Sequence, residues 1–279
     1  MAQHDYVIDN STGANVRADI NNALLAISSN NSGSSAPSTN YASQFFANTS
    51  SSMMQLRNTS NNAHINLFTL AGAPAFPVDG TINSINIGKG ANSVAGNTVL
   101  GESALDASVT GGENTAIGKE ALTALTSGVK NTAVGLSAGK ALTTGDNNTF
   151  IGRNAGIATT TADGNTALGL NALNTNSTGA SNVAIGMQAL NGNTTASNNV
   201  AVGHQAMISN TTGTQNVAIG QTALNANTTA NNNTGVGYQA LTANTTGANN
   251  VAVGSNALDA ATTANNNVAI GIAASGANT

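Results

Sequence analysis

Residues able to carry chemistry are few in this chain and lie far apart. The three histidines, His4, His64 and His204, fall in three different segments, and no two have the i, i+4 spacing that brings two imidazoles to one metal ion. The chain has no cysteine, so it forms neither disulfides nor thiolate metal sites. Glu113 and Glu120 are a single carboxylate pair, which is weak support for acid–base catalysis. The sequence therefore predicts no catalytic, cofactor-binding or metal-binding residues, and no enzyme.

Glycine-rich motifs do not alter this expectation. Gly235-Val236-Gly237 lacks the strand–helix context of a dinucleotide site. The calcium-binding pattern Gly-Gly-x-Gly-x-Asp of short-period β-rolls is absent.

Composition narrows the function classes further. Only 6% of the 279 residues are charged, against about 25% in an ordinary domain. The net charge of −4 provides no basic patch, so we expect no nucleic-acid partner. No run of 18 apolar residues exists, and Met1–Tyr6 has neither the basic nor the apolar region of an export signal, so we expect no membrane insertion.

One stretch, Asn182–Leu190, recurs every 17 residues, and this period organises most of the chain. Disordered low-complexity tracts do not keep a strict register, whereas a fixed short period is typical of a solenoid. Near-copies begin at Asn97, Asn114, Asn131, Asn148, Asn165, Asn199, Asn216, Asn233, Asn250 and Asn267. The sequence thus predicts a mainly β protein, a parallel β-roll or solenoid of eleven 17-residue coils.

Numbering each unit from its Asn assigns a role to each position. Position 4 is always a branched aliphatic residue, and we predict that it forms the core column, while the Gly at position 5 bends the chain. Ala at position 8 and Leu at position 9 suit a second short inward-facing strand, and Asn-Thr-Thr-Gly turns the chain back, so each coil should hold two strands and two turns. Stacked Asn at position 1 should form an amide ladder. The predicted core column comprises Ile117, Val134, Ile151, Leu168, Ile185, Val202, Ile219, Val236, Val253 and Ile270.

Position 6 varies freely from coil to coil, which is typical of an exposed surface or of a contact between chains. Arg153, Met187, His204 and Tyr238 belong to this column. If the protein binds something along its length, these four residues are the candidate site, although an unconstrained surface is the better explanation of the variation.

The residues before the repeats divide into three segments. A helix is expected over Asn15–Ile27, since its apolar residues form one stripe; the stripe needs a partner, either the rest of the chain or other copies of the same helix. Short strands are expected at Tyr41–Phe46, Met53–Arg57 and His64–Leu70, and a degenerate first coil at Ser84–Gly88. The resulting division is an arm with its helix (1–36), a β-meander (37–72), a connector with the atypical coil (73–96) and the repeat shaft (97–279).

The pattern Asn-Thr-Ala-Ile-Gly-x-x-Ala-Leu resembles the head repeats of trimeric autotransporter adhesins. It is even more similar to the shaft repeats of phage tail fibres, where Asn-Thr-Thr-Gly joins successive coils. The resemblance covers residues 97–279. In the adhesin family such coils form a left-handed parallel β-roll and three chains associate side by side, so the resemblance implies a left-handed homotrimer.

The N-terminal region resembles the opening of tail fibre proteins of tailed phages, through Met1–Tyr6, Ala18–Leu24 and Ser32–Thr39. A segment like Tyr41–Phe46 follows there too, usually with Trp in place of Phe. The resemblance implies a virion protein assembled in the host cytoplasm. Its N-terminal region would dock on tail or adaptor proteins, and its shaft would project toward a host receptor or a separate tip protein.

Two other functions fit parts of the sequence. Regular Thr-Thr pairs could match an ice lattice or serve another surface adhesin. Their Gly and Asn neighbours, however, favour a turn over the flat sheet that ice binding needs. Thermal hysteresis at micromolar protein concentration would support an ice-binding function, and its absence would exclude it. A glycan depolymerase would require a carboxylate pair in a groove and would degrade a polysaccharide substrate.

Overall fold

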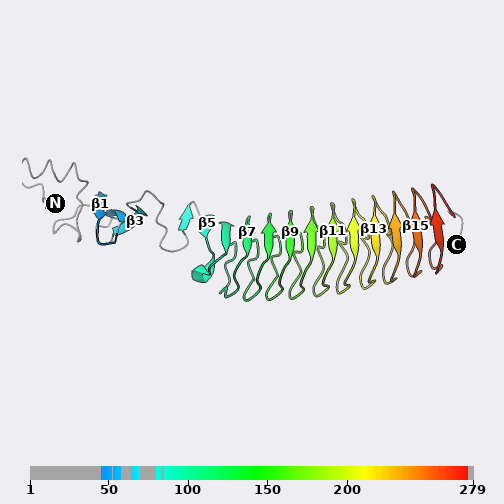
Figure 1. The fold of residues 1–279 in the computed structure, drawn as a ribbon, viewed down its shortest axis with the longest axis horizontal. Helices are drawn as coiled ribbons and strands as arrows, with labels where there is room; N and C mark the ends of the chain where they lie inside the picture. The colour runs from blue at the N-terminus through cyan, green and yellow to red at the C-terminus, as the bar shows by residue number, and fades with distance from the viewer. Residues whose placement is uncertain (1–44, 52, 58–63, 70–79, 83–84, 276–279) are drawn as a thin grey trace, which may run out of the picture. The chain divides into compact units, whose positions relative to one another are not determined.

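The computed structural model describes residues 45–51, 53–57, 64–69, 80–82 and 85–275, in two compact units, Met1–Val78 and Asp79–Thr279 (Figure 1). The predicted helix over Asn15–Ile27 and its arm lie outside the described residues.

The first unit contains a small antiparallel sheet. Its strands are β1 (Phe45–Asn48), β2 (Met53–Arg57) and β3 (His64–Thr69), paired in chain order. Asn48 stabilises the first turn, because its side-chain oxygen accepts hydrogen bonds from the backbone N–H groups of Ser50 and Ser51, both at 3.1 Å. The three strands occupy the segment in which the sequence predicts a meander.

The second unit is a parallel β-solenoid, and this confirms the predicted fold class. Eleven strands, one per coil, stack in parallel in a single sheet, and each residue pairs with the residue 17 positions later (Figure 1). The strands are β6 (Thr98–Gly101), β7 (Thr115–Ile117), β8 (Thr132–Val134), β9 (Thr149–Ile151), β10 (Thr166–Leu168), β11 (Val183–Ile185), β12 (Val200–Val202), β13 (Val217–Ile219), β14 (Thr234–Val236), β15 (Val251–Val253) and β16 (Val268–Ile270).

An antiparallel hairpin precedes the parallel stack. Strand β4 (Gly80–Ile82) pairs with β5 (Ile85–Gly88), and β5 pairs antiparallel with β6. The prediction that Ser84–Gly88 is a degenerate first coil is therefore wrong, because the strand within this segment runs opposite to the coils. The 3₁₀ turn η1 (Ala91–Ser93) then closes the base of the first coil, where the Ala91 N–H donates to the Leu105 carbonyl at 3.1 Å.

Each coil contains one three- or four-residue strand, and the predicted second strand is absent from the described coils. Positions 5, 7, 9 and 17 have positive φ, as at Gly186 (127°), Gln188 (59°), Leu190 (49°) and Asn198 (62°). A chain that alternates between left-handed and ordinary conformations cannot be extended, so positions 7 to 9 form tight turns. These turns still bond from coil to coil: the Leu190 N–H donates to the Ala206 carbonyl at 3.0 Å.

The predicted core column is wrong, because position 4 faces outward. Ala at position 3, Ala at position 8 and Leu at position 9 fill the interior instead and are almost all fully buried. Side chains alternate along the strand as predicted, but position 3 faces the interior and positions 2 and 4 face outward. Of the predicted core residues, Leu168, Ile219, Val253 and Ile270 are exposed, and Ile117, Val134, Ile151, Ile185, Val202 and Val236 are half-buried.

The width of the interior explains this phase. A Cβ placed on Gly235, at position 3, would lie 3.4 Å from Leu224 Cγ and 3.2 Å from the Ala240 carbonyl oxygen. A methyl group therefore fits between the strand and the Leu column, and among the described coils a branched aliphatic residue occupies position 3 only in the first, where Val99 is buried.

Phe150, the one aromatic residue at position 3 of the described coils, supports this explanation. It occupies position 3 and is fully buried, and position 9 is Gly both in its own coil (Gly156) and in the preceding coil (Gly139). A Cβ on Gly156 would lie 2.5 Å from the Phe150 ring, and one on Gly139 would lie 2.8 Å from it. The aromatic ring thus fills the space that two Leu side chains occupy elsewhere.

The predicted amide ladder at position 1 is present, and its Asn residues are buried from Asn97 to Asn250. The Oδ1 atom of Asn182 accepts a hydrogen bond from the Asn199 N–H at 3.0 Å. Its Nδ2 group donates to the carbonyl of Ala196, at position 15 of the same coil, at 2.8 Å. Each side chain therefore binds a neighbouring coil and also closes its own turn.

A second amide ladder runs along position 12, and the sequence reasoning missed it. Five consecutive coils carry a fully buried Asn there: Asn176, Asn193, Asn210, Asn227 and Asn244. Asn193 Nδ2 donates both to Asn176 Oδ1 at 2.8 Å and to the Ala196 carbonyl at 3.0 Å. The carbonyl at position 15 therefore accepts from both ladders and joins them.

From Gly145 to Ala264, coils with Gly at position 15 alternate with coils that have Ala there. The residue after each Ala reaches back to the preceding Gly coil: Ser197 Oγ accepts from the Ala180 N–H at 3.0 Å, and Asn265 Oδ1 accepts from the Ala248 N–H at 2.6 Å. Ala180 and Ala248 have no side-chain acceptor to offer the coils before them. The coils of this region are therefore built in pairs of 34 residues.

The Gly column at position 5 should be the most sensitive column to substitution. A Cβ on Gly186 would lie 2.5 Å from the Gly203 carbonyl oxygen, at a φ of 127°. We expect Gly186→Ala to destabilise the solenoid by about 3 kcal/mol, from backbone strain and overpacking. Thermal unfolding followed by circular dichroism measures the change.

Gly164→Asn is the matched control. Gly164, at position 17, has a φ of 66°, and a Cβ added there would meet only Ser181 Oγ, at 3.7 Å. Its column neighbours Asn147 and Ser181 adopt a φ of 58° without being glycine. This variant should unfold at or above the wild-type temperature. Equal losses in the two variants would contradict the assignment of position 5 as the close contact between coils.

Ala261→Asn should stabilise the chain. Asn244 Oδ1 is buried without a hydrogen-bond partner, because position 12 of the next coil is Ala261, where earlier coils carry Asn. The new amide would donate to this oxygen, and the gain should be about 1 kcal/mol. Ala260→Asn, one residue away, is the control and should not raise the unfolding temperature. A lower melting temperature for Ala261→Asn would contradict the ladder explanation.

Candidate interaction surface

The histidine and carboxylate side chains considered above do not lie together in the described part of the chain. His204 is the only histidine with a described side chain, and Glu113 is exposed on a turn at position 17. No group of three His, Cys, Asp or Glu side chains that could hold a metal ion occurs among the described residues.

The sequence reasoning missed one motif of catalytic serines, Gly-x-Ser-x-Gly, which occurs at Gly135-Leu136-Ser137-Ala138-Gly139. In α/β-hydrolases this pattern exposes a Ser beside a His. Here Ser137 is largely buried and its hydroxyl donates to Glu120 Oε2 at 2.9 Å. The only described histidine, His204, lies four coils away, so the geometry assigns Ser137 a structural contact.

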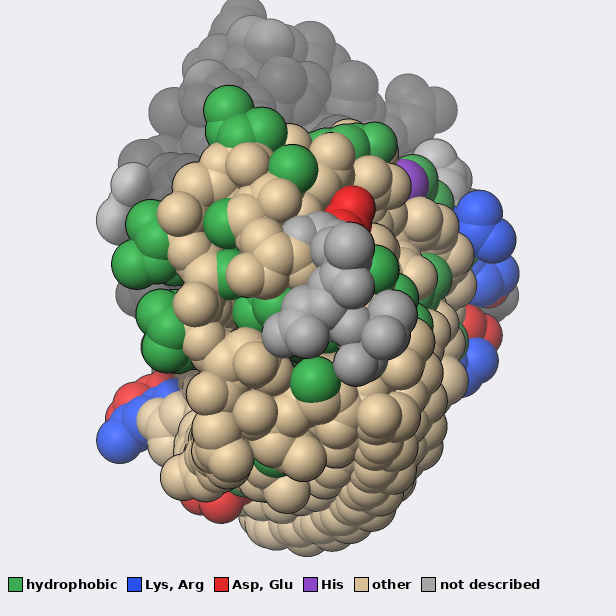
Figure 2. All heavy atoms as spheres, turned by 90° about the vertical axis from the view of Figure 1, so that its right-hand side faces the viewer, with side chains coloured by type: hydrophobic (Ala, Val, Ile, Leu, Met, Phe, Trp, Pro, Cys, Tyr) green, Lys and Arg blue, Asp and Glu red, His purple; other side chains and the backbone are tan. Residues whose placement is uncertain are grey.

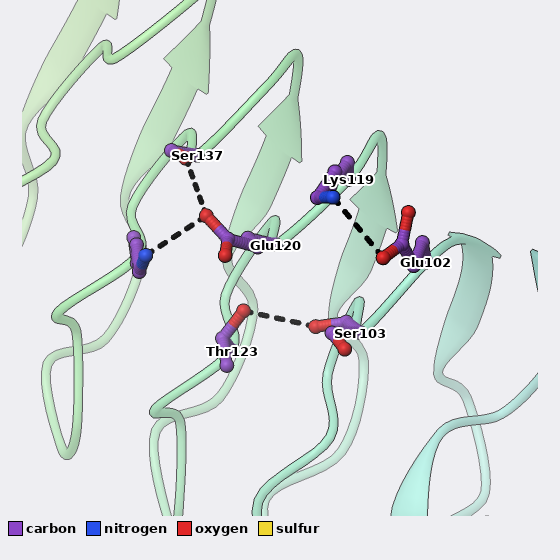
Figure 3. Close-up of polar contacts among 7 residues, drawn as sticks. Glu102, Ser103, Lys119, Glu120, Thr123 and Ser137 are labelled. Carbon is purple, nitrogen blue, oxygen red and sulfur yellow. Dashed lines mark hydrogen bonds and ion pairs between the residues drawn. The ribbon is translucent and has the colours of Figure 1, made fainter.

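Charged side chains bridge the first coils of the solenoid (Figure 3). Lys119 Nζ contacts Glu102 Oε1 at 3.1 Å, and Lys140 Nζ contacts Glu120 Oε2 at 2.8 Å. The hydrogen bonds from Lys140 and then from Ser137 lower the pKa of Glu120. Because these ion pairs are partly exposed, they contribute little to the stability of the fold.

The outward face of the sheet carries the main feature of the surface, a column of apolar side chains. Positions 2, 4 and 6 are half-buried or exposed in every coil, and we call them the apolar strip because position 4 is always aliphatic. Position 2 of the strip is Thr or Val, and position 6 includes the charged Glu102, Lys119 and Arg153. Figure 2 shows hydrophobic side chains protruding on one side of the coils, at the left of the view. Side chains of the strip that are between 36% and 47% exposed are Leu100, Leu136, Leu168, Leu170, Met187, Ile219, Tyr238 and Val253.

The candidate residues of position 6 lie on this strip. Arg153 is exposed, Met187 and Tyr238 are 44% and 47% exposed, and His204 is half-buried. Met187 and Tyr238 are therefore apolar members of this outward face, whereas Arg153 and His204 place polar side chains on it, and the four do not form a separate site. The misplaced core column of position 4 supplies the rest of that face.

Charge is absent from most of this surface. Between Asp163 and Asp259 the sequence contains no Asp, Glu, Lys or Arg. A protruding apolar strip over five coils without charge is unusual for a chain that remains single in water, because large exposed apolar patches mark interaction sites.

The Thr-Thr pairs occupy a different part of each coil. At position 13 the hydroxyl donates to the next coil, as Thr211 Oγ1 does to the Thr228 carbonyl at 3.0 Å. At position 14 the side chain is exposed, as at Thr212 and Thr229. Only one row of hydroxyl groups is therefore free to face a ligand.

No family model, curated protein or solved structure matches the chain. Within the described residues, no helix has the length and apolar character needed to cross a membrane.

Proposed function

We propose that the protein is a structural component of a phage virion, a tail fibre whose solenoid is the shaft of a homotrimer. The observation that carries the proposal is the apolar strip, which leaves one face of an otherwise polar coil stack in need of a partner. The repeat resemblance to fibre shafts supports the same function.

The partner that fits the strip best is another copy of the chain. The apolar side chains recur once per coil, at about 4.8 Å along the stack. A partner that covers the strip over many coils must repeat with the same spacing, and a second copy does so in register. Three copies placed around one axis would each cover the strip of a neighbour, and such closed symmetry is usual for oligomers.

In this proposal the N-terminal region docks on tail or adaptor proteins and the solenoid projects toward the host. Backbone bonding between every pair of coils suits a stiff spacer, because extension cannot occur without breaking a ladder. The shaft repeats one unit and therefore offers little receptor specificity, so a separate tip protein or the last coils would contact the host receptor.

The ice-binding alternative has weaker support. An ice-matching face needs a two-dimensional array of free hydroxyl groups, whereas the position 13 hydroxyls bond internally and position 14 provides a single row on a bend.

Self-association can be tested by placing charge on the strip. At neutral pH the wild type should sediment at three times the 27.4 kDa chain mass. Ile219→Lys combined with Val253→Lys should give monomers, because the buried ammonium groups would lack partners. Thr229→Lys with Thr263→Lys changes exposed position 14 of the same two coils and should remain trimeric. A monomeric wild type, or a trimeric strip variant, would refute the interface.

The virion assignment has its own test. Gold-labelled antibodies against the solenoid should bind to thin appendages of the tail in electron micrographs of phage particles that carry this protein. Cryo-EM of the same particles should show three copies in each fibre. Labelling of the capsid alone, or particles free of the protein, would be evidence against a tail fibre.

A further inference from the structure

His204 occupies an unusual place on the apolar strip. It is half-buried at position 6, and the same position in the adjacent coils is Met187 and Gln221. Two coils away on either side, position 6 carries the exposed Leu170 and Tyr238. An ionisable ring thus lies in the middle of the surface that the proposed assembly would cover.

No opposite charge lies near His204 on its own chain. The elements packed on its coil, β11 and β13 with their turns, contain no charged residue, and Tyr238 is the only other titratable group between Asp163 and Asp259. Those two carboxylates belong to coils three steps away on either side. That separation is about 14 Å along the stack, beyond the Debye length of roughly 8 Å in physiological salt.

A second copy supplies no counterion either. If the chains associate in register, the coils facing His204 are those near its own level. Because these coils are uncharged throughout, the same holds if one chain slips by a coil. Any charge on the imidazole would therefore be covered by apolar and amide groups of the partner, and three copies would bring three such charges to one level of the trimer.

We infer that His204 makes self-association pH-sensitive, so that the trimer is favoured with a neutral imidazole and weakened by its protonation. This inference rests on the proposed homotrimer. Imidazoles gain their charge between about pH 8 and 5. A charge that assembly removes from water without a partner disfavours the assembled state. By linkage, association should therefore be strongest above this range and decline as the pH falls.

The test compares association at pH 7.5 and pH 5.5 by sedimentation velocity over a dilution series of the full chain. The wild-type association constant should fall at least about tenfold at pH 5.5, because protonation disfavours the assembled state. His204→Gln, which introduces the residue found at position 6 of the next coil, should stay trimeric at both values. His204→Lys, whose charge persists at both values, should be weakened at both. Lys119 occupies position 6 in another coil, so this variant should fold, and circular dichroism verifies it.

The double variant His4→Gln with His64→Gln controls for the other two histidines and should keep the wild-type pH response. Equal association of the wild type at both pH values would overturn the inference and leave the trimer standing. A pH response that persists in His204→Gln would overturn it as well. A wild type that is monomeric at pH 7.5 would instead show that the proposed assembly itself fails.

Discussion

The close approach of backbone to backbone between successive coils is the constraint on which the rest of the solenoid depends. At position 5 the next coil lies so near that a single methyl group would meet a carbonyl oxygen, at 2.2 to 2.7 Å along the column from Gly101 to Gly254. This proximity lets the amide ladders at positions 1 and 12 bridge the coils. The ladders satisfy the polar groups of a turn-rich backbone inside a narrow core, where unpaired groups would be costly.

Much of this architecture could be predicted from the sequence, because identical residues at a fixed period must stack on one another. The period, the strand at positions 2 to 4, the bend at position 5 and the ladder at position 1 all follow from the columns. Which strand positions face inward does not follow from the columns, because Ile185 is more hydrophobic than Ala184 and yet faces outward. The width of the interior sets this choice, and that width depends on how far Leu190 reaches across the coil. The Asn residues at position 12 were visible as a column, but a turn explained them equally well.

The candidate surface was harder to predict for the same reason. An assignment of position 4 to the core leaves position 6 isolated, so that its residues look unconstrained. With positions 2, 4 and 6 on one face, Met187 and Tyr238 become parts of a continuous strip. The uncharged stretch between Asp163 and Asp259 could be read directly from the sequence, but it gains meaning only once its exposed face is known to be apolar. The ion pairs of Glu102 and Glu120 lie outside this stretch, in the first coils.

The pairing of coils with Gly and coils with Ala at position 15 has a consequence for how such a solenoid could change in length during evolution. Removing one Gly coil would bring two Ala coils together, an arrangement that does not occur in this chain. Removing 34 residues instead would keep the alternation of Gly and Ala coils, so that bonds of the kind made by Ser197 and Asn265 to the preceding Gly coil could still form. Duplications and deletions that survive selection should therefore come in double steps, each about 10 Å of shaft. The length of the solenoid would then change in units of two coils and not of one.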